Sequence, residues 1–290
     1  MAQDTHATVP ETIASSSRAL AVGSNNFDQL KKDLTEVYEN RAQLLRQLSK
    51  AKFNYYLTFF FSSKDKRGLK KANIRDLKEK VANAYISLSF RKVMKDAGSW
   101  DESSFYLQEL MQQCHKIWDL TSRQNTDQLR QRTIATESLE RKLVSLRQQK
   151  SLDFIKSDVD NLYLPNLNGA DLYIYPTFIV LFKSYKQFGI HDLSKVNVSL
   201  VASSFQEEHG VPKDTEIVGQ TYKFTNKNGQ PDKRYKNNYK IPIVRYGDMR
   251  LRSESGINDR YQFSNFDKFA EFAKSFATYA QSNLGISVDK

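Results

Sequence analysis

Residues 161–182 read NLYLPNLNGADLYIYPTFIVLF and divide the chain into two parts with different hydrophobic periods. The first half of this stretch, up to Gly169, is rich in residues that interrupt helices and strands. Before it, apolar residues recur every three or four positions, which is the period of amphipathic helices. After it, β-branched and aromatic residues alternate with polar ones, which is typical of strands. We therefore predict a helical part followed by a β-rich part, with the domain boundary near 155–168.

The predicted helical domain covers residues 27–160. No Pro or Gly occurs between Phe27 and Arg67, so one long helix is expected to begin at Phe27. Further stripes at 74–88, 107–117 and 139–155 predict an antiparallel helical bundle that is partly coiled coil. The longest helix is expected to support self-association, and residues 121–138 are compatible with a solvated helix or a loop.

The predicted β-domain covers residues 168–282. Six or seven strands are expected between 172 and 263, with an Asn-Gly turn at Asn228-Gly229. Four phenylalanines at helical spacing then predict a closing amphipathic helix that begins after Asn265. The predicted fold class is α+β: an N-terminal helical bundle followed by a mostly antiparallel β-domain closed by a C-terminal helix.

Two segments of the β-domain carry a resemblance to known domains. Residues 178–182, FIVLF, are followed by residues 188–199, FGIHDLSKVNVS. Together they look like the first hairpin of pleckstrin-homology-like and GRAM-like β-domains. The resemblance is confined to 168–282, and long polar insertions at 203–214 and 226–238 depart from it. It implies a protein, peptide or lipid partner for this domain.

Composition and charge narrow the class of protein. No apolar run approaches the roughly 20 residues that span a bilayer, so no transmembrane segment is predicted. Residues 1–26 are rich in Ser, Thr and Ala, and we expect a disordered tail without a secretory signal and a cytoplasmic location. The net charge is +11, and residues 1–150 hold 26 basic and 17 acidic side chains, a net of +9. This basic half favours polyanionic partners, or it keeps a long helical surface in solution.

The sequence contains no recognisable catalytic motif. A single cysteine, Cys114, and four scattered histidines do not form a metal-ligand pattern. Phosphate-binding loops, nucleophile elbows and dinucleotide fingerprints are also missing. We therefore expect no enzyme activity, catalytic residue, metal or cofactor, although an enzyme with an unrecognised site stays an alternative.

Two clusters are candidate binding sites. The first is the aromatic run 53–61, which is followed by a set of cations: Lys64, Lys66, Arg67, Lys70, Lys71, Arg75 and Lys78. Such a set can stack bases and hold phosphates, or insert at an acidic membrane surface. Alternatively, the rings form the core of the bundle and the cations its solvated turn. The second cluster is a basic loop between strands, with Lys233, Arg234, Tyr235, Lys236 and Tyr239.

These features predict a non-enzymatic binding or scaffold protein. Its helices would serve self-association or docking, and its β-domain would recognise a ligand. A protein partner or a homo-oligomer is expected first. A nucleic-acid-binding protein that uses the basic region 64–80 is the alternative function, and an acidic membrane surface is a further partner that this region fits.

Overall fold

The computed structural model describes residues 20–21, 27–124, 137–144, 150–167, 169–208, 210–226 and 228–289. The described residues divide into two compact units. The first unit holds residues 20–21, 28–89 and 152–158, and the second holds the remaining described residues. The predicted tail 1–26 lies outside the described residues except for 20–21.

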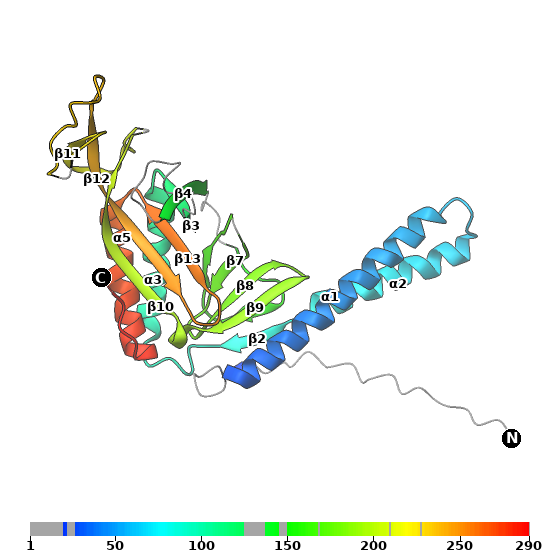
Figure 1. Cartoon of the computed structure of the whole chain (residues 1–290). Coiled ribbons are helices and arrows are strands. Elements are labelled where there is room, and N and C mark those ends of the chain that lie inside the picture. Colours follow the sequence, from blue (N-terminus) through cyan, green and yellow to red (C-terminus); the bar gives the residue numbers. More distant parts are fainter. Residues whose placement is uncertain are drawn as a thin grey trace. The chain divides into compact units, whose positions relative to one another are not determined.

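The first unit is built on a helical hairpin (Figure 1). Helix α1 (Phe27–Leu57) and helix α2 (Lys64–Asn83) pack through Leu48, Leu77 and Val81, with partly buried leucine, isoleucine and alanine side chains around them. A parallel three-stranded sheet completes the unit, in the order β1 (Leu20–Ala21), β2 (Ile86–Ser89) and β5 (Ile155–Ser157). The long leucine stripe of α1 therefore faces α2 over part of its length.

Arg41 explains why the apolar stripe of α1 is interrupted. Its guanidinium is buried and donates to the carbonyl oxygens of Val81, at 2.5 Å, and Ala84, at 3.1 Å. These carbonyls lie at the C-terminal end of α2, where the last turn of a helix leaves acceptors without a partner inside the helix. The carboxylate of Asp153 lies 3.6 Å from the same guanidinium. Arg41, a charged residue in the apolar stripe of α1, thus caps the C-terminal end of α2.

The second unit contains two antiparallel sheets and two longer helices. The larger sheet has the order β10-β12-β13-β3-β4, with β11 paired to β12, and the smaller one has the order β6-β7-β8-β9. The strands are β3 (Ile117–Gln124), β4 (Glu137–Val144), β6 (Leu162–Leu164), β7 (Asp171–Ile174), β8 (Phe178–Ser184), β9 (Gln187–Asp192), β10 (Asn197–Gln206), β11 (Glu216–Tyr222), β12 (Lys240–Arg252) and β13 (Asn258–Phe263). A 3-10 turn, η2 (Leu193–Lys195), connects β9 to β10.

Helix α3 (Ala97–Gln113) packs along helix α5 (Phe266–Tyr279), which continues as a π-helical turn, η3 (Ala280–Leu284). Asn265 caps α5, because its side-chain oxygen accepts a hydrogen bond from the amide of Lys268 at 3.1 Å. The ring of Phe269 lies directly over Gly247 of β12. The apolar face of α5 is therefore buried, as its phenylalanine spacing predicts.

The structure confirms the α+β class but corrects the helical domain. Residues 117–124 and 137–144 are strands, not helix or loop, and residues 125–136 lie outside the described part. The prediction of a helix over 139–155 is therefore wrong. The physical reason is hydrogen bonding: β3 pairs with β13 and β4 pairs with β3, and apolar residues at three- or four-residue spacing do not reveal such partners. The two units also do not follow the predicted boundary, because residues 90–124 belong with the β-rich unit.

A pair of carboxylates in the larger sheet makes stability depend on pH. Burial, and then the negative charge of Asp119, raises the pKa of Asp259 from 3.8 to about 6. Asn166 donates to the Asp259 carboxylate at 2.6 Å. The folded state therefore favours the protonated form of Asp259. The stabilisation that results is complete below the pKa of Asp259 in the unfolded chain, and it is lost as the pH rises through about 6.

We expect Asp259→Asn to stabilise the protein at neutral pH, because the amide oxygen can still accept from Asn166 and carries no charge. A pKa shift of this size corresponds to roughly 2–3 kcal/mol of unfolding free energy above pH ~7. Urea unfolding at about pH 4 and pH 7.5 measures the difference between variant and parent. A gain that is the same at both pH values contradicts the assignment, and Glu254→Gln in an exposed loop is the control.

Candidate functional site

The end of the α1–α2 hairpin is an ordered turn. The side-chain oxygen of Thr58 donates to the carbonyl of Asn54 at 2.6 Å, and the amide of Phe61 donates to the carbonyl of Thr58 at 3.2 Å. Ser63 then starts α2, because its side-chain oxygen accepts from the amide of Lys66 at 3.4 Å. Local hydrogen bonds therefore define the backbone that carries the aromatic run. We call residues 53–71 the hairpin tip.

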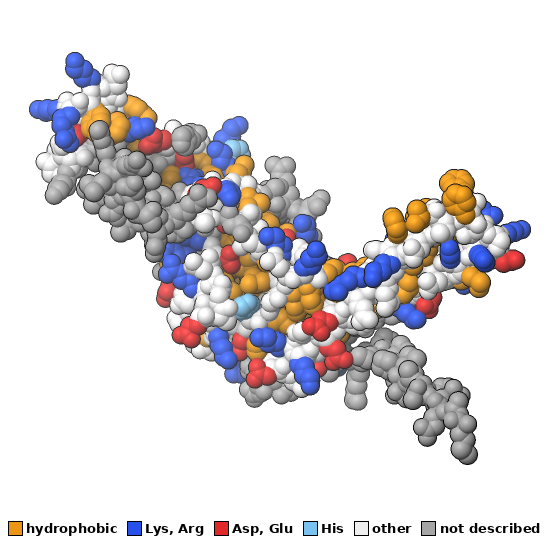
Figure 2. Space-filling view, turned by 45° about the vertical axis from the view of Figure 1, so that its right-hand side comes forward, with side chains coloured by type: hydrophobic (Ala, Val, Ile, Leu, Met, Phe, Trp, Pro, Cys, Tyr) orange, Lys and Arg blue, Asp and Glu red, His pale blue; other side chains and the backbone are white. Residues whose placement is uncertain are grey.

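The hairpin tip exposes its aromatic side chains. Phe60 and Phe61 are 88% and 92% exposed, the highest values among the exposed large hydrophobic residues. The other exposed apolar side chains of the tip are Phe53, Tyr56, Leu57 and Leu69. Figure 2 shows these hydrophobic side chains gathered at the end of the hairpin, with Lys and Arg beside them. The interpretation that the aromatic run forms the bundle core is therefore wrong, because leucines of α1 and α2 take that place.

The aromatic rings of the tip pack against one another edge to face. The ring centroids of Tyr55 and Phe59 are 5.6 Å apart at an interplanar angle of 69°, and those of Phe59 and Phe60 are 5.5 Å apart at 89°. Edge-to-face contact is a favourable geometry for aromatic pairs. The rings of Tyr55, Phe59 and Phe60 therefore form a cluster at the turn, and Tyr55 and Phe59 support the more exposed Phe60.

The predicted cations lie around this cluster on α2. Two of them contact the turn itself: Lys70 donates to the Thr58 side chain at 2.5 Å, and the Arg67 guanidinium lies 5.1 Å from the centre of the Phe59 ring. The other five, Lys64, Lys66, Lys71, Arg75 and Lys78, are exposed. Within the hairpin tip, five basic residues and one acidic residue give a net charge of +4. The structure thus places Arg67 and Lys70 against the aromatic turn, and the other predicted cations are exposed along α2.

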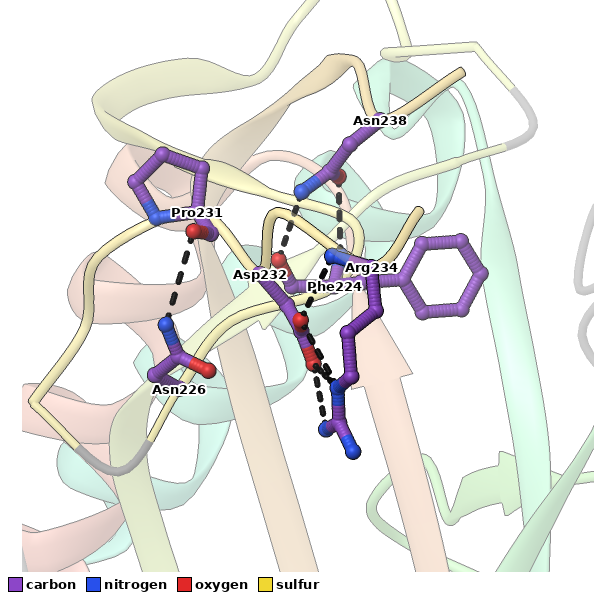
Figure 3. A network of polar contacts seen from close by, with 6 residues as sticks. All are labelled: Phe224, Asn226, Pro231, Asp232, Arg234 and Asn238. Atoms are coloured by element: carbon purple, nitrogen blue, oxygen red, sulfur yellow. Dashed lines mark hydrogen bonds and ion pairs between the residues drawn. The ribbon is translucent and has the colours of Figure 1, made fainter. Parts of the chain in front are cut away.

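The second predicted cluster lies in the connection between β11 and β12, residues 223–239, which we call the β11–β12 loop. Asn238 joins the two ends of this loop by hydrogen bonds to Phe224. Its side chain accepts from the amide of Phe224 at 3.1 Å and donates to the carbonyl of Phe224 at 2.7 Å (Figure 3). Asn226 donates to the carbonyl of Pro231 at 3.5 Å in the same view. Gly229 has a φ of 79°, which fits the predicted Asn-Gly turn. The loop is therefore held by its own asparagines.

The basic side chains of the β11–β12 loop are partly held and partly exposed. Arg234 is bound to Asp232 through its Nε at 3.0 Å and its terminal nitrogen at 2.6 Å, yet its side chain is 84% exposed. These hydrogen bonds from Arg234 lower the pKa of Asp232. The Tyr235 ring stacks on Phe224 with centroids 3.9 Å apart. Lys233, Lys236 and Tyr239 are exposed.

Lys223 extends the polar surface of this loop. Its ammonium donates to Glu208 at 2.7 Å and to the Tyr239 hydroxyl at 3.3 Å, and these hydrogen bonds raise the pKa of Lys223. The arrangement presents cations and aromatic faces in a fixed geometry. It suits recognition of an anionic group, and among these residues we find no nucleophile that is paired with a base.

Sequence reasoning missed one charged aromatic cluster. The Arg141 guanidinium of β4 lies 3.9 Å from the centre of the Trp118 ring and 4.1 Å from that of Phe205. Glu207 accepts from this guanidinium at 3.0 Å and from the Tyr246 hydroxyl at 2.8 Å. The wrong helical prediction for 139–155 hid the cluster. The alternation of Trp118 and Leu120 was the available signal for a strand.

Among the described histidine and cysteine side chains, His191 has its Nδ1 atom 2.7 Å from the Ser255 hydroxyl, and Cys114 and His115 are neighbours just before β3. Burial raises the pKa of the Cys114 thiol, which disfavours the nucleophilic thiolate. Its sulfur lies 3.4 Å from the Ser264 hydroxyl, while the backbone amide of His115, not its ring, contacts Asp214. Among the described residues, no group of three His, Cys, Asp or Glu side chains is arranged to hold a metal ion. His209 lies outside the described residues.

Comparison with known proteins does not assign this chain to a family. No family model, no curated protein and no solved structure matches this chain. In the part of the chain that the structure describes, none of the helices has the length and apolar character needed to cross a bilayer.

Proposed function

We propose that this chain is a non-enzymatic binding protein that docks through the hairpin tip. The observation that carries the proposal is the exposure of Phe60 and Phe61, at 88% and 92%, beside a cluster of cations. Burying one phenylalanine side chain contributes roughly 1.5–3 kcal/mol. Exposed aromatic rings gathered in one place, with polar residues around them, are typical of an interaction surface.

The β11–β12 loop is proposed as a second recognition surface. Its support is the combination of exposed Lys233, Arg234 and Lys236 with a backbone that Asn226 and Asn238 hold in place. Binding groups are often carried by loops on a rigid sheet. The resemblance of residues 168–282 to pleckstrin-homology-like domains stays a prediction, and so does self-association through α1. Both would fit a binding protein.

Site-specific photo-crosslinking tests the proposal. We expect a photoreactive phenylalanine analogue at position 61 to form adducts in a whole-cell extract, because that ring projects from the turn. The matched control is the same analogue at Phe105 of α3, which is 58% exposed and lies outside the tip. Mass spectrometry then assigns each adduct to lipid, nucleic acid or protein. Equal labelling at positions 61 and 105 would contradict a specific docking role for the tip.

A further inference from the structure

We infer that the hairpin tip inserts into the surface of an anionic lipid bilayer. The inference rests on the proposed function, and it names the partner of the same surface. Its support comes from the position of the rings, the placement of the cations and the packing geometry of the rings.

The position of the rings suits entry into a flat surface. Phe60 and Phe61 occupy the turn that connects the two helices, so they lie at the end of the hairpin. The packed leucine core of the hairpin extends to Ala51 on α1 and Ile74 on α2, which leaves the tip beyond it without a core of its own. An element of this form can place its last turn in a bilayer while its core stays in water. Peripheral elements bury apolar side chains about 5–10 Å into the headgroup and acyl boundary.

The cations are placed for lipid phosphates. Lys64 and Lys66 lie in the first turn of α2, within five residues of Phe61, and Lys71 lies in the second turn. Long basic side chains can keep their charged ends at the headgroup level while their stems cover apolar surface. Tyr56, which is exposed on the opposite helix, is a residue type favoured at the membrane–water boundary. The positive charge of the tip therefore complements an anionic surface.

The ring packing engages the inner rings of the tip and leaves the outer ones, Phe60 and Phe61, open to solvent. Here the edge of one ring meets the face of the next, in the pairs Tyr55–Phe59 and Phe59–Phe60. Phe59 also has the Arg67 guanidinium 5.1 Å from its ring centre. The cluster is a compact apolar projection, which a lipid interior accommodates without any matching shape.

The test uses the full chain with Phe61→Trp as a fluorescent reporter. Both native tryptophans, Trp100 and Trp118, are buried in the second unit, so a tryptophan at position 61 is the exposed one. We expect a blue shift and quenching by brominated acyl chains when vesicles of phosphatidylcholine with about one-third phosphatidylserine are added. Vesicles of phosphatidylcholine alone should bind far more weakly, and rising salt should weaken binding to the anionic vesicles.

Two double variants assign the binding to rings and cations, measured by vesicle sedimentation. Lys66→Glu with Lys71→Glu should reduce the affinity at least about 30-fold, because each cation near an anionic surface contributes about fivefold. Phe60→Ser with Phe61→Ser should reduce it by about tenfold or more. The matched controls are Lys92→Glu with Lys95→Glu, and Phe105→Ser, all at exposed positions outside the tip. The controls should bind as the parent does, and all thermal midpoints should stay close to that of the parent.

The outcomes separate this inference from the proposed function. No partition into anionic vesicles at low salt overturns the inference, and so does binding that the tip variants do not change. Tighter binding of the same tip to single-stranded DNA, measured by fluorescence anisotropy, also overturns it in favour of a nucleic acid. If crosslinking at position 61 then still yields specific protein or nucleic-acid adducts, the proposed docking function stands with another partner. If neither vesicle binding nor specific crosslinking at position 61 is observed, the proposed docking function is contradicted as well.

Discussion

Gly247→Ala is expected to lower the free energy of unfolding by at least about 3 kcal/mol, because the added methyl group has no space. A Cβ built on Gly247 would lie 2.1 Å from the Cγ atom of Phe269 and 2.7 Å from its Cβ atom. The Phe269 Cβ belongs to the stem of the side chain, so a rotation of the ring alone cannot relieve the clash. Helix α5 would have to move away from β12.

Gly219→Ala is the matched control for this prediction, since it lies in the same sheet and its Cβ would meet Ile243 atoms at 3.8 Å or more. We expect that substitution to change stability by less than about 1 kcal/mol. Urea unfolding followed by circular dichroism measures both variants. Equal effects at positions 219 and 247 would show that α5 does not pack on β12 as described.

Asp248→Ala is expected to cost about 3 kcal/mol or more, because Asp248 is a buried anion between two cations. Its carboxylate is fully buried and accepts from the Nε atoms of Arg250 and Arg260, each at 3.0 Å. Arg250 and Arg260 face each other directly across β12 and β13. Like charges in directly opposite positions destabilise a sheet, so removal of the carboxylate leaves the two guanidiniums in repulsion.

The salt dependence identifies the mechanism of this loss. Raising the ionic strength should recover part of the stability of Asp248→Ala, since it screens the repulsion between Arg250 and Arg260. Asp101→Ala is the control, because Asp101 makes a similar two-oxygen contact with Arg91 in an exposed pair and should cost less than about 1 kcal/mol. A loss at position 248 no larger than that at position 101 would contradict the structural role of the buried anion.

The first unit shows how far the sequence alone leads. The spacing of leucines in α1 predicts the helix and the face that α2 covers, but the Gly- and Pro-free run continues to Arg67, beyond the end of α1 at Leu57. The break after Leu57 has no such signature, because Thr58 and Ser63 form the turn through local hydrogen bonds in the middle of an aromatic run. The association of aromatic and basic residues at 53–71 was visible in the sequence, since it depends on neighbours along the chain.

The sequence also determined most strands after residue 170, where alternation and β-branched residues define the period. Tertiary structure decided the rest. Residues 117–124 became a strand because β13 offers hydrogen-bonding partners more than 100 residues away, and residues 137–144 pair in turn with that strand. A three- or four-residue spacing of leucines contains no information about these partners. The sequence also left open whether Phe60 and Phe61 are buried or exposed, because an apolar residue type does not by itself reveal its surroundings. Only the packing of α1 on α2, whose apolar core ends before the turn, leaves these rings in water.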